Sequence, residues 1–285
     1  MAASVASRAS RPEKTSRPAG VIDMIDGIGG VLAGPANVIM QLSWPEVGYG
    51  VVESKVDSGK ITKHPVKRAR TTFTYLSVAL FGSDDERAVY RKAVNRSHAQ
   101  VHSGPDSPVE YNAFNTDLQL WVAACLYYGA ADIAERFMGP LSDEEADALY
   151  EAAKPMGTTL QVKPEMWPAD RAAFKEYWED ALTKVSIDPT VRRYLYDLVA
   201  LKHLPLVIQR IQARYSLWVT TGFLPPLFRE QMKLDWSDED EARFDRHIKK
   251  LAAFSRRMPA VIRRFPFNYF LWDFRIRVKL HLPLV

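Results

Sequence analysis

The chain has 285 residues, of which 47% are hydrophobic and 25% are charged, with one cysteine and a net charge of +4. A chain of this size can bury a sizeable core, and a lone cysteine excludes an internal disulfide framework and a cysteine-rich zinc module. Residues 1–18 carry +3 of the net charge. The rest is nearly neutral, which argues against the basic face of a dedicated nucleic-acid binder.

Residues 1–19 are mostly Ala, Ser, Arg and Pro, a composition that predicts a disordered basic tail. Residues 20–285 show no linker or repeat and predict one folded domain. No apolar run reaches the roughly 18 residues of a membrane span. No apolar run directly follows the basic N-terminus, as a secretory signal would require. We therefore expect a cytoplasmic protein.

The first elements are predicted from the spacing of side chains and from residues that typically start or end a helix. The segment Gly48 to Val56 alternates weakly and is interpreted as a short extended or looped stretch. Residues 65–82 carry larger side chains at three- and four-residue steps, which predicts a helix ending at Gly82. Ser83 is followed by three acidic residues, which predicts the cap of a helix running to about Val101.

The later elements have similar helix starts. Asp117 is expected to cap a long apolar helix, and Ser142 with Glu145 fits a capping box. Pro168, Pro189 and the segment 237–240 each precede helical sequence. The prediction is an all-α fold, a single mainly helical domain.

Most common catalytic motifs are absent: there is no serine nucleophile elbow, phosphate-binding glycine loop or HExxH zinc motif. The glycines at 27, 29 and 30 lack the preceding strand and the later acidic residue of a dinucleotide site. They are interpreted as a turn or a close helix contact.

His98 is the strongest chemical lead. It shares one helix face with Tyr90, Val94 and Val101, so its imidazole lies on an apolar side. One interpretation is a core histidine bonded to a backbone carbonyl. The other is an axial ligand of haem iron, for which a neutral imidazole in an apolar pocket is suited.

His102 follows His98 by four residues, a spacing at which two imidazoles can share a zinc or non-haem iron ion. A third ligand such as Glu53 would complete that site. Alternatively, His102 interacts with the carbonyls at the end of the helix. Glu53 itself follows an apolar run and is either a partly buried base or a glutamate at the edge of a loop.

Lys67, Arg68 and Arg70 lie at the start of a predicted helix, where cations are mildly unfavourable. They are either a solvated turn or partners of an acidic group such as a haem propionate, Glu53 or a substrate carboxylate. The C-terminal third is rich in aromatic and basic residues. That composition is typical of core with snorkelling cations, of a membrane-contacting surface, or of a tunnel for a hydrophobic substrate.

Taken in order, several segments resemble one family, the rubber oxygenases or latex clearing proteins, which also includes the ER-bound oxygenase of mycophenolic acid biosynthesis. The resemblance covers roughly residues 20–260. Its segments are VIMQLSWPEVGYGVVES (38–54), HPVKRARTT (64–72), LSVALFG (76–82), VNRSHAQVHSG (94–104), YNAFNTDLQLWVAACL (111–126), PLSDEEADALYEA (140–152) and TGFLPPLFREQMKLDWSDED (221–240).

The resemblance implies a mostly α fold around haem b and oxygen-dependent chemistry on hydrophobic substrates. It places the axial histidine at His98. The distal arginine–threonine motif corresponds to Arg68, Thr71 and Thr72. Thr71 stands where rubber oxygenases carry a distal lysine, which argues against rubber itself as the substrate.

The resemblance places the distal acidic residue at Glu53, where most relatives have histidine. The helix that carries Trp121 is expected to form an apolar wall of the cofactor and substrate pocket. The expected catalytic residues are thus Glu53, Arg68 and Thr72, and the expected partners are O2, a hydrophobic substrate and an electron donor. The alternatives are a haem peroxidase and a haem carrier, sensor or interaction protein without turnover.

Overall fold

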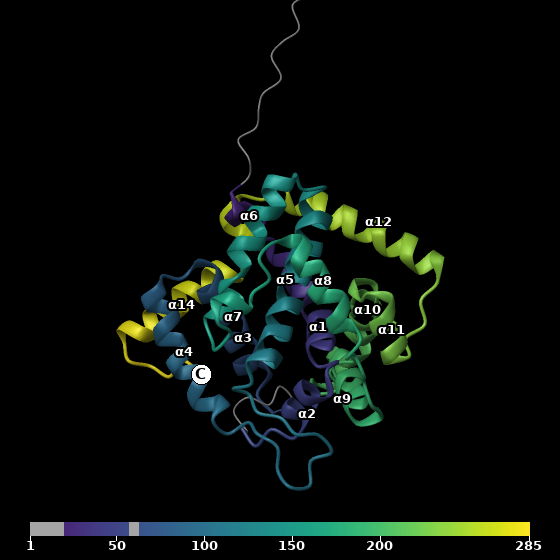
Figure 1. The fold of residues 1–285 in the computed structure, drawn as a ribbon. Helices are drawn as coiled ribbons and strands as arrows, with labels where there is room; N and C mark the ends of the chain where they lie inside the picture. Colours follow the sequence, from purple (N-terminus) through teal and green to yellow (C-terminus); the bar gives the residue numbers. More distant parts are fainter. Residues whose placement is uncertain (1–19, 57–62) are drawn as a thin grey trace, which may run out of the picture.

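The computed structural model describes residues 20–56 and 63–285 (Figure 1), so the predicted tail 1–19 lies outside the described residues. The described chain is helical, which confirms the all-α prediction, and its only β pairing is an isolated bridge. The helices are α1 (Gly27–Gln41), α2 (Pro45–Val52), α3 (Pro65–Phe81), α4 (Asp84–His98), α5 (Thr116–Met138), α6 (Asp143–Ala153), α7 (Pro155–Thr158), α8 (Arg171–Leu182), α9 (Pro189–Val199), α10 (Leu206–Phe223), α11 (Pro226–Met232), α12 (Asp238–Ser255), α13 (Ala260–Arg263) and α14 (Phe267–Lys279).

Helix α5 runs through the centre of the molecule, with α1, α7 and α12 packed against it (Figure 1). Its first turn is capped by Asn115, whose side chain accepts from the backbone N–H groups of Asp117 and Leu118 at 2.9 and 3.2 Å. The predicted cap at Asp117 is therefore displaced by two residues. Asp117 lies in the first turn, where a carboxylate still interacts favourably with the helix dipole.

The core around α5 is built from stacked indoles. Trp121 lies between Trp44 and Trp178, with ring centroids 4.9 and 5.2 Å away. The Trp121 ring is fully buried, and its Nε1 donates to the Gln41 carbonyl at 3.1 Å. Aromatic stacking of this kind fixes the separation of α5, α8 and the start of α2, where Trp44 is the N-cap.

The predicted helix starts at Ser83 and Ser142 are confirmed as full capping boxes, with Glu86 and Glu145 as the reciprocal partners. Each box satisfies two backbone N–H groups that a helix otherwise leaves unpaired. Ser237 forms a third box at the start of α12. These local signals could be read from the sequence because they involve residues only three positions apart.

Two expected boundaries were wrong. Gly48–Val56 was expected to be extended or looped, which is correct for residues 53–56 only. Residues Pro45–Val52 form helix α2, with Pro45 in its first turn. Gly48 is used for packing here, because an added Cβ would meet the Leu42 carbonyl oxygen at 2.8 Å. The helix expected to reach Val101 ends at His98, where the chain turns and the Val101 N–H bonds the His98 carbonyl at 2.9 Å.

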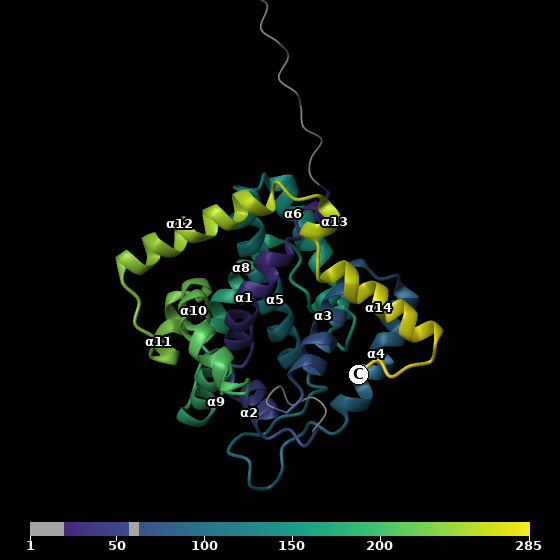
Figure 2. The ribbon, with the colours of Figure 1, turned by 180° about the vertical axis from the view of Figure 1, so that it is seen from behind.

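The remaining helices form two flanks around α1 and α5. Helix α14 packs along α3 on one side, and α9 to α12 lie on the other, as the reverse view also shows (Figure 2). The chain ends beside α4, where Leu284 and Val285 pack near Tyr90. Within the described residues, no helix is both long and apolar enough to cross a membrane.

Candidate active site

A cavity of about 330 Å³ lies between α2, α3, α4 and α5. Its walls are predominantly apolar, with a few convergent polar groups, which is the usual character of a site for a small ligand or cofactor. Helix α5 contributes Leu118, Val122 and Leu126 to the apolar wall. The polar groups come mainly from α2, α3 and the end of α4.

His98 is the last residue of α4, and its side chain lines the cavity. The ring meets Phe114 edge-on at a centroid distance of 6.3 Å. Burial and the nearby Arg68 charge lower the His98 pKa to about 4, so the imidazole is neutral at pH 7. Its Nδ1 is buried and has no hydrogen-bond partner among the described residues, an unmet capacity that costs free energy unless a bound group relieves it.

No backbone carbonyl and no carboxylate of the described residues accepts a hydrogen bond from the His98 Nδ1. The interpretation of His98 as an ordinary core histidine bonded to a carbonyl loses its support for the same reason. The ring instead lies at the edge of open space with a buried, unpartnered nitrogen.

Helix α3 forms the facing wall with Arg68, Thr71 and Thr72. Arg68 lines the cavity and is exposed to solvent, while desolvation by the many protein groups around it lowers its pKa. No carboxylate of the described residues forms an ion pair with Arg68. The acidic partner expected for this cluster is thus not Glu53, and the guanidinium stays available to an anionic group in the cavity.

Hydrogen bonds across the helices fix the register of α3 and α4. The Tyr90 hydroxyl of α4 donates to the Thr71 carbonyl of α3 at 2.8 Å. Arg91 donates to the carbonyls of Thr158 and Thr159 at 2.6 and 2.5 Å, which ties α4 to the end of α7. These contacts hold the helix that carries His98 against the helix that carries Arg68.

A network of hydrogen bonds joins α5 to α4 close to His98 in the sequence. Gln119 of α5 and Gln161 exchange hydrogen bonds of 2.6 and 2.9 Å, and Gln161 also donates to Asn95 at 2.8 Å. Asn95 is three residues before His98 on α4. Gln119 and Gln161 carry no motif that sequence analysis would single out, because their role exists only once α4 and α5 are adjacent.

Glu53 lies next to the cavity and does not line it. Its carboxylate accepts from the Tyr111 hydroxyl at 3.0 Å, and Tyr111 forms part of the cavity wall. Burial and the Glu53 contact raise the Tyr111 pKa to about 12. The carboxylate residue that does line the cavity is Glu46 of α2, which sequence analysis missed because α2 was not recognised as a helix.

The structure places Trp121 away from the cavity. It was expected at the cofactor, but it is fully buried in the indole stack of the core and does not line the cavity. Its helix does form a wall, as expected, through the residues on its neighbouring face. Periodicity identified the correct helix, but the large indole fills the core between α1 and α8.

His102 is exposed beyond the end of α4, with its Nδ1 3.3 Å from the Ser103 carbonyl oxygen. Its backbone forms the isolated bridge to Asn112 that closes the base of the following loop. Among the described residues, no group of three or more His, Cys, Asp or Glu side chains is arranged to hold a metal ion. The two-histidine metal site with Glu53 is therefore not assembled.

The residues that face the cavity fit a haem. A neutral imidazole with an unpartnered nitrogen, an unpaired guanidinium and apolar walls are the groups needed for an iron ligand, a propionate partner and a ring pocket. His98 would hold the iron, and Arg68 would hold a propionate or other anion.

Comparison with known proteins identifies the family of the chain. The family described as "ER-bound oxygenase mpaB/B'/Rubber oxygenase, catalytic domain" matches residues 24–257. Uncharacterised proteins of Mycobacterium bovis and Mycobacterium tuberculosis are each 49% identical over 244 residues, covering 86% of this chain and 96% of their own lengths. No solved structure matches the chain at a significant level. The chain belongs to the family of ER-bound oxygenase mpaB/B'/rubber oxygenase catalytic domains.

Proposed function

We propose that this protein is a b-type haem-dependent oxygenase that acts with O2 on a small or lipid-like hydrophobic substrate. The observation that carries the proposal is that His98, Arg68 and Thr72 all line the same mostly apolar cavity. Membership of an oxygenase family supports the reaction class. An external electron donor is part of the proposal.

Haem, when bound, would supply the redox chemistry with O2, while the protein supplies orientation and polarity. The neutral His98 ring is in the protonation state that an iron ligand requires. Arg68 holds an anion in the cavity, and the Thr72 hydroxyl is a hydrogen-bond donor beside it. The apolar side chains of α5 exclude water and orient the substrate.

Two carboxylates serve proton movement in this proposal. Glu46 faces the cavity and accepts a proton from a bound substrate. Glu53 acts one step further out, through the Tyr111 hydroxyl that donates to it. The raised Tyr111 pKa keeps that proton on the phenol oxygen between turnovers.

The first experiment is an absorption spectrum of the purified protein, as isolated and after hemin, dithionite and CO are added in turn. We expect a Soret band that shifts when CO binds, because a haem held by His98 would leave room for CO in the cavity. We also expect O2 consumption with a reductant and an olefinic lipid. A flat spectrum after hemin addition would overturn the proposal.

His98→Ala is expected to lose the Soret band, or to lower haem affinity at least about tenfold. The matched control is His102→Ala, which removes an exposed imidazole four residues away and should leave the spectrum unchanged. If the two variants behave alike, His98 is not the ligand. Haem binding without O2 consumption would instead identify a carrier or sensor.

A further inference from the structure

The first half of α10 is largely exposed to solvent. Residues 219–223 of this helix are buried, while 206–215 are largely exposed. Val207 and Ile211 are 67% and 68% exposed, and Leu206 and Ile208 are exposed beside them. A helix half with bare aliphatic side chains needs a partner surface to reduce its contact with water.

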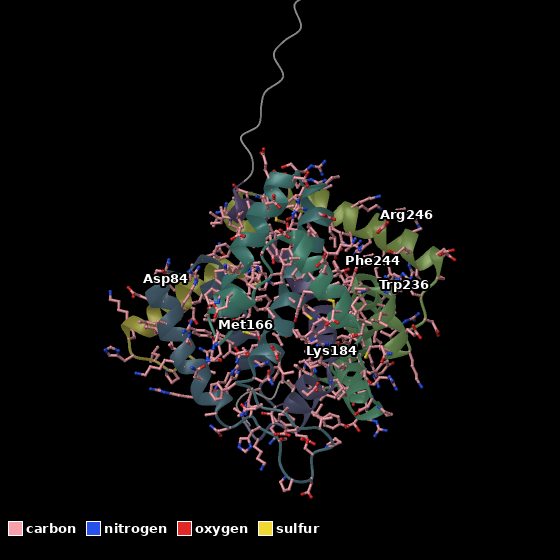
Figure 3. The ribbon with its side chains drawn as sticks, in the orientation of Figure 1. Asp84, Met166, Lys184, Trp236, Phe244 and Arg246 are labelled. Carbon is pink, nitrogen blue, oxygen red and sulfur yellow. The ribbon has the colours of Figure 1, made fainter. Side chains whose placement is uncertain are left out.

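A basic groove of about 590 Å³ adjoins this helix half, between α10 and α12. Its cations are Arg214 of α10 and Arg243, Arg246 and Lys250 of α12, around Trp218. Arg243 pairs with Asp240 at 3.0 Å. Within the described chain, Arg214, Arg246 and Lys250 have no carboxylate partner, and Arg246 extends from α12 at the edge of the molecule (Figure 3).

The aliphatic side chains and the groove share one face of α10. Residues 207, 211, 214 and 218 follow each other at steps of four, three and four, which is the spacing of a single helix face. Val207 and Ile211 therefore lie about 10 and about 5 Å along the helix axis from Arg214. One flat partner would contact both.

We propose that this face of α10 and α12 docks the protein on the surface of an anionic lipid bilayer. The aliphatic side chains of α10 enter the boundary between headgroups and acyl chains, and the groove cations bind lipid phosphates. This combination of an apolar and a basic surface is characteristic of peripheral membrane helices. A hydrophobic substrate dissolved in a bilayer would then be close to the protein.

Charge decides between a bilayer and a second copy of the chain. A symmetric dimer through this face would place the basic groove of one copy near that of the other, and like charges in an interface are unfavourable. A bilayer that contains acidic lipids supplies the opposite charge over a wide area. The excess of unpaired cations thus favours the lipid surface.

A second exposed apolar patch provides a matched comparison. Val261 and Ile262 on α13 are 71% and 57% exposed. The nearby cations Arg263 and Arg264 are paired with Asp23 at 3.8 and 2.6 Å. Val261 and Ile262 offer similar apolar surface, and the cations that directly follow them in sequence are paired.

The test is co-sedimentation of the full-length protein with vesicles of phosphatidylcholine alone or mixed with phosphatidylglycerol. We expect binding only to the anionic vesicles, and weaker binding as salt increases. Arg214→Glu, Arg246→Glu and Lys250→Glu combined should weaken the binding at least about 100-fold. Val207→Ser with Ile211→Ser should weaken it about tenfold.

The control variants change the net charge or remove exposed aliphatic side chains outside the face of α10 and α12. Lys92→Glu, Lys163→Glu and Lys175→Glu alter the net charge equally, and Val261→Ser with Ile262→Ser removes equivalent side chains; both should bind as the unaltered protein does. All substituted groups are partly or largely exposed, and thermal melts by circular dichroism check folding. No binding to anionic vesicles, or equal loss in the control variants, overturns the proposal. A dimer in sedimentation velocity that Val207→Ser with Ile211→Ser disrupts, without vesicle binding, overturns it as well.

Discussion

Arg68 shows how a single residue can serve function at the expense of stability. Its guanidinium is desolvated, its pKa is lowered, and no carboxylate of the described chain pairs with it. An unpaired charge in such surroundings does not stabilise a fold. The anion proposed to bind in the cavity would neutralise this charge.

Arg68→Met is therefore expected to separate stability from binding. In the haem-free protein, the free energy of unfolding should stay the same or rise by up to about 1 kcal/mol, because the exposed cavity surface partly solvates the charge. Haem affinity should fall about tenfold or more, because a charge-assisted contact is lost. Urea denaturation and hemin titration measure the two effects. A loss of stability greater than about 1 kcal/mol would show that Arg68 is structural instead.

Among the elements, α1 illustrates how glycines allow helices to approach closely. The glycines at its start are interpreted as a turn or a close helix contact. Gly29 confirms the helix contact, because an added Cβ would lie 2.6 Å from Ile133 Cγ2 of α5. A Cβ added at Gly27 would lie 1.6 Å from the Phe265 carbonyl oxygen, which no small side-chain adjustment can relieve. Gly34, on the same helix, has no neighbouring atom within 4 Å of such a Cβ.

Gly27→Ala and Gly34→Ala should therefore differ strongly in effect. The first is expected to lower the free energy of unfolding by about 3 kcal/mol or more, because backbone must move. The second should change it by less than about 1 kcal/mol, because the entropy gain of alanine in a helix is opposed by the contact of its Cβ with the following Pro35. Thermal and urea denaturation of both variants checks the pair. Similar values for the two would contradict the close contact of α1 with Phe265.

In the molecule as a whole, α14 links the end of the chain to the site. It packs along α3, and Phe73 of α3 stacks on Phe270 of α14 at 5.6 Å. Arg275 of α14 donates to Glu86 at 2.7 Å, the same glutamate that completes the capping box of α4. The C-terminal helix thereby holds both helices that carry the candidate ligands.

The Arg275 contact gives the stability of the protein a defined pH dependence. The hydrogen bond from Arg275 holds the Glu86 pKa below its ordinary value. A carboxylate with a lowered folded-state pKa stabilises the protein above its unfolded pKa, and that contribution disappears as pH falls through the folded pKa.

Arg275→Met should accordingly lower the free energy of unfolding at pH 7 by about 0.5–1 kcal/mol, a modest value because the pair is partly exposed. The difference from the unaltered protein should shrink as the pH falls below the ordinary Glu86 pKa. Urea denaturation at a series of pH values measures it, with Arg257→Met as an exposed control. A difference that stays constant down to pH 3 would rule out the Glu86 contact as its cause.

The sequence by itself determined the local structure and the family. Capping boxes, N-terminal prolines and the periodicity of residues 65–82 act over three or four residues, so α3, α4, α6 and α12 could be recognised in advance. The ordered segments around His98 and Arg68 supported the family, and both residues do line one cavity.

Only the tertiary structure decided which side chains reach that cavity. Trp121 is taken up by the core, Glu53 lies behind Tyr111, and Glu46 and Gln119 enter the site without any sequence signal. Periodicity defines the face of a helix, but not which of its neighbours fills the adjacent space. That choice depends on contacts between residues far apart in the chain, and those contacts exist only once the helices have packed.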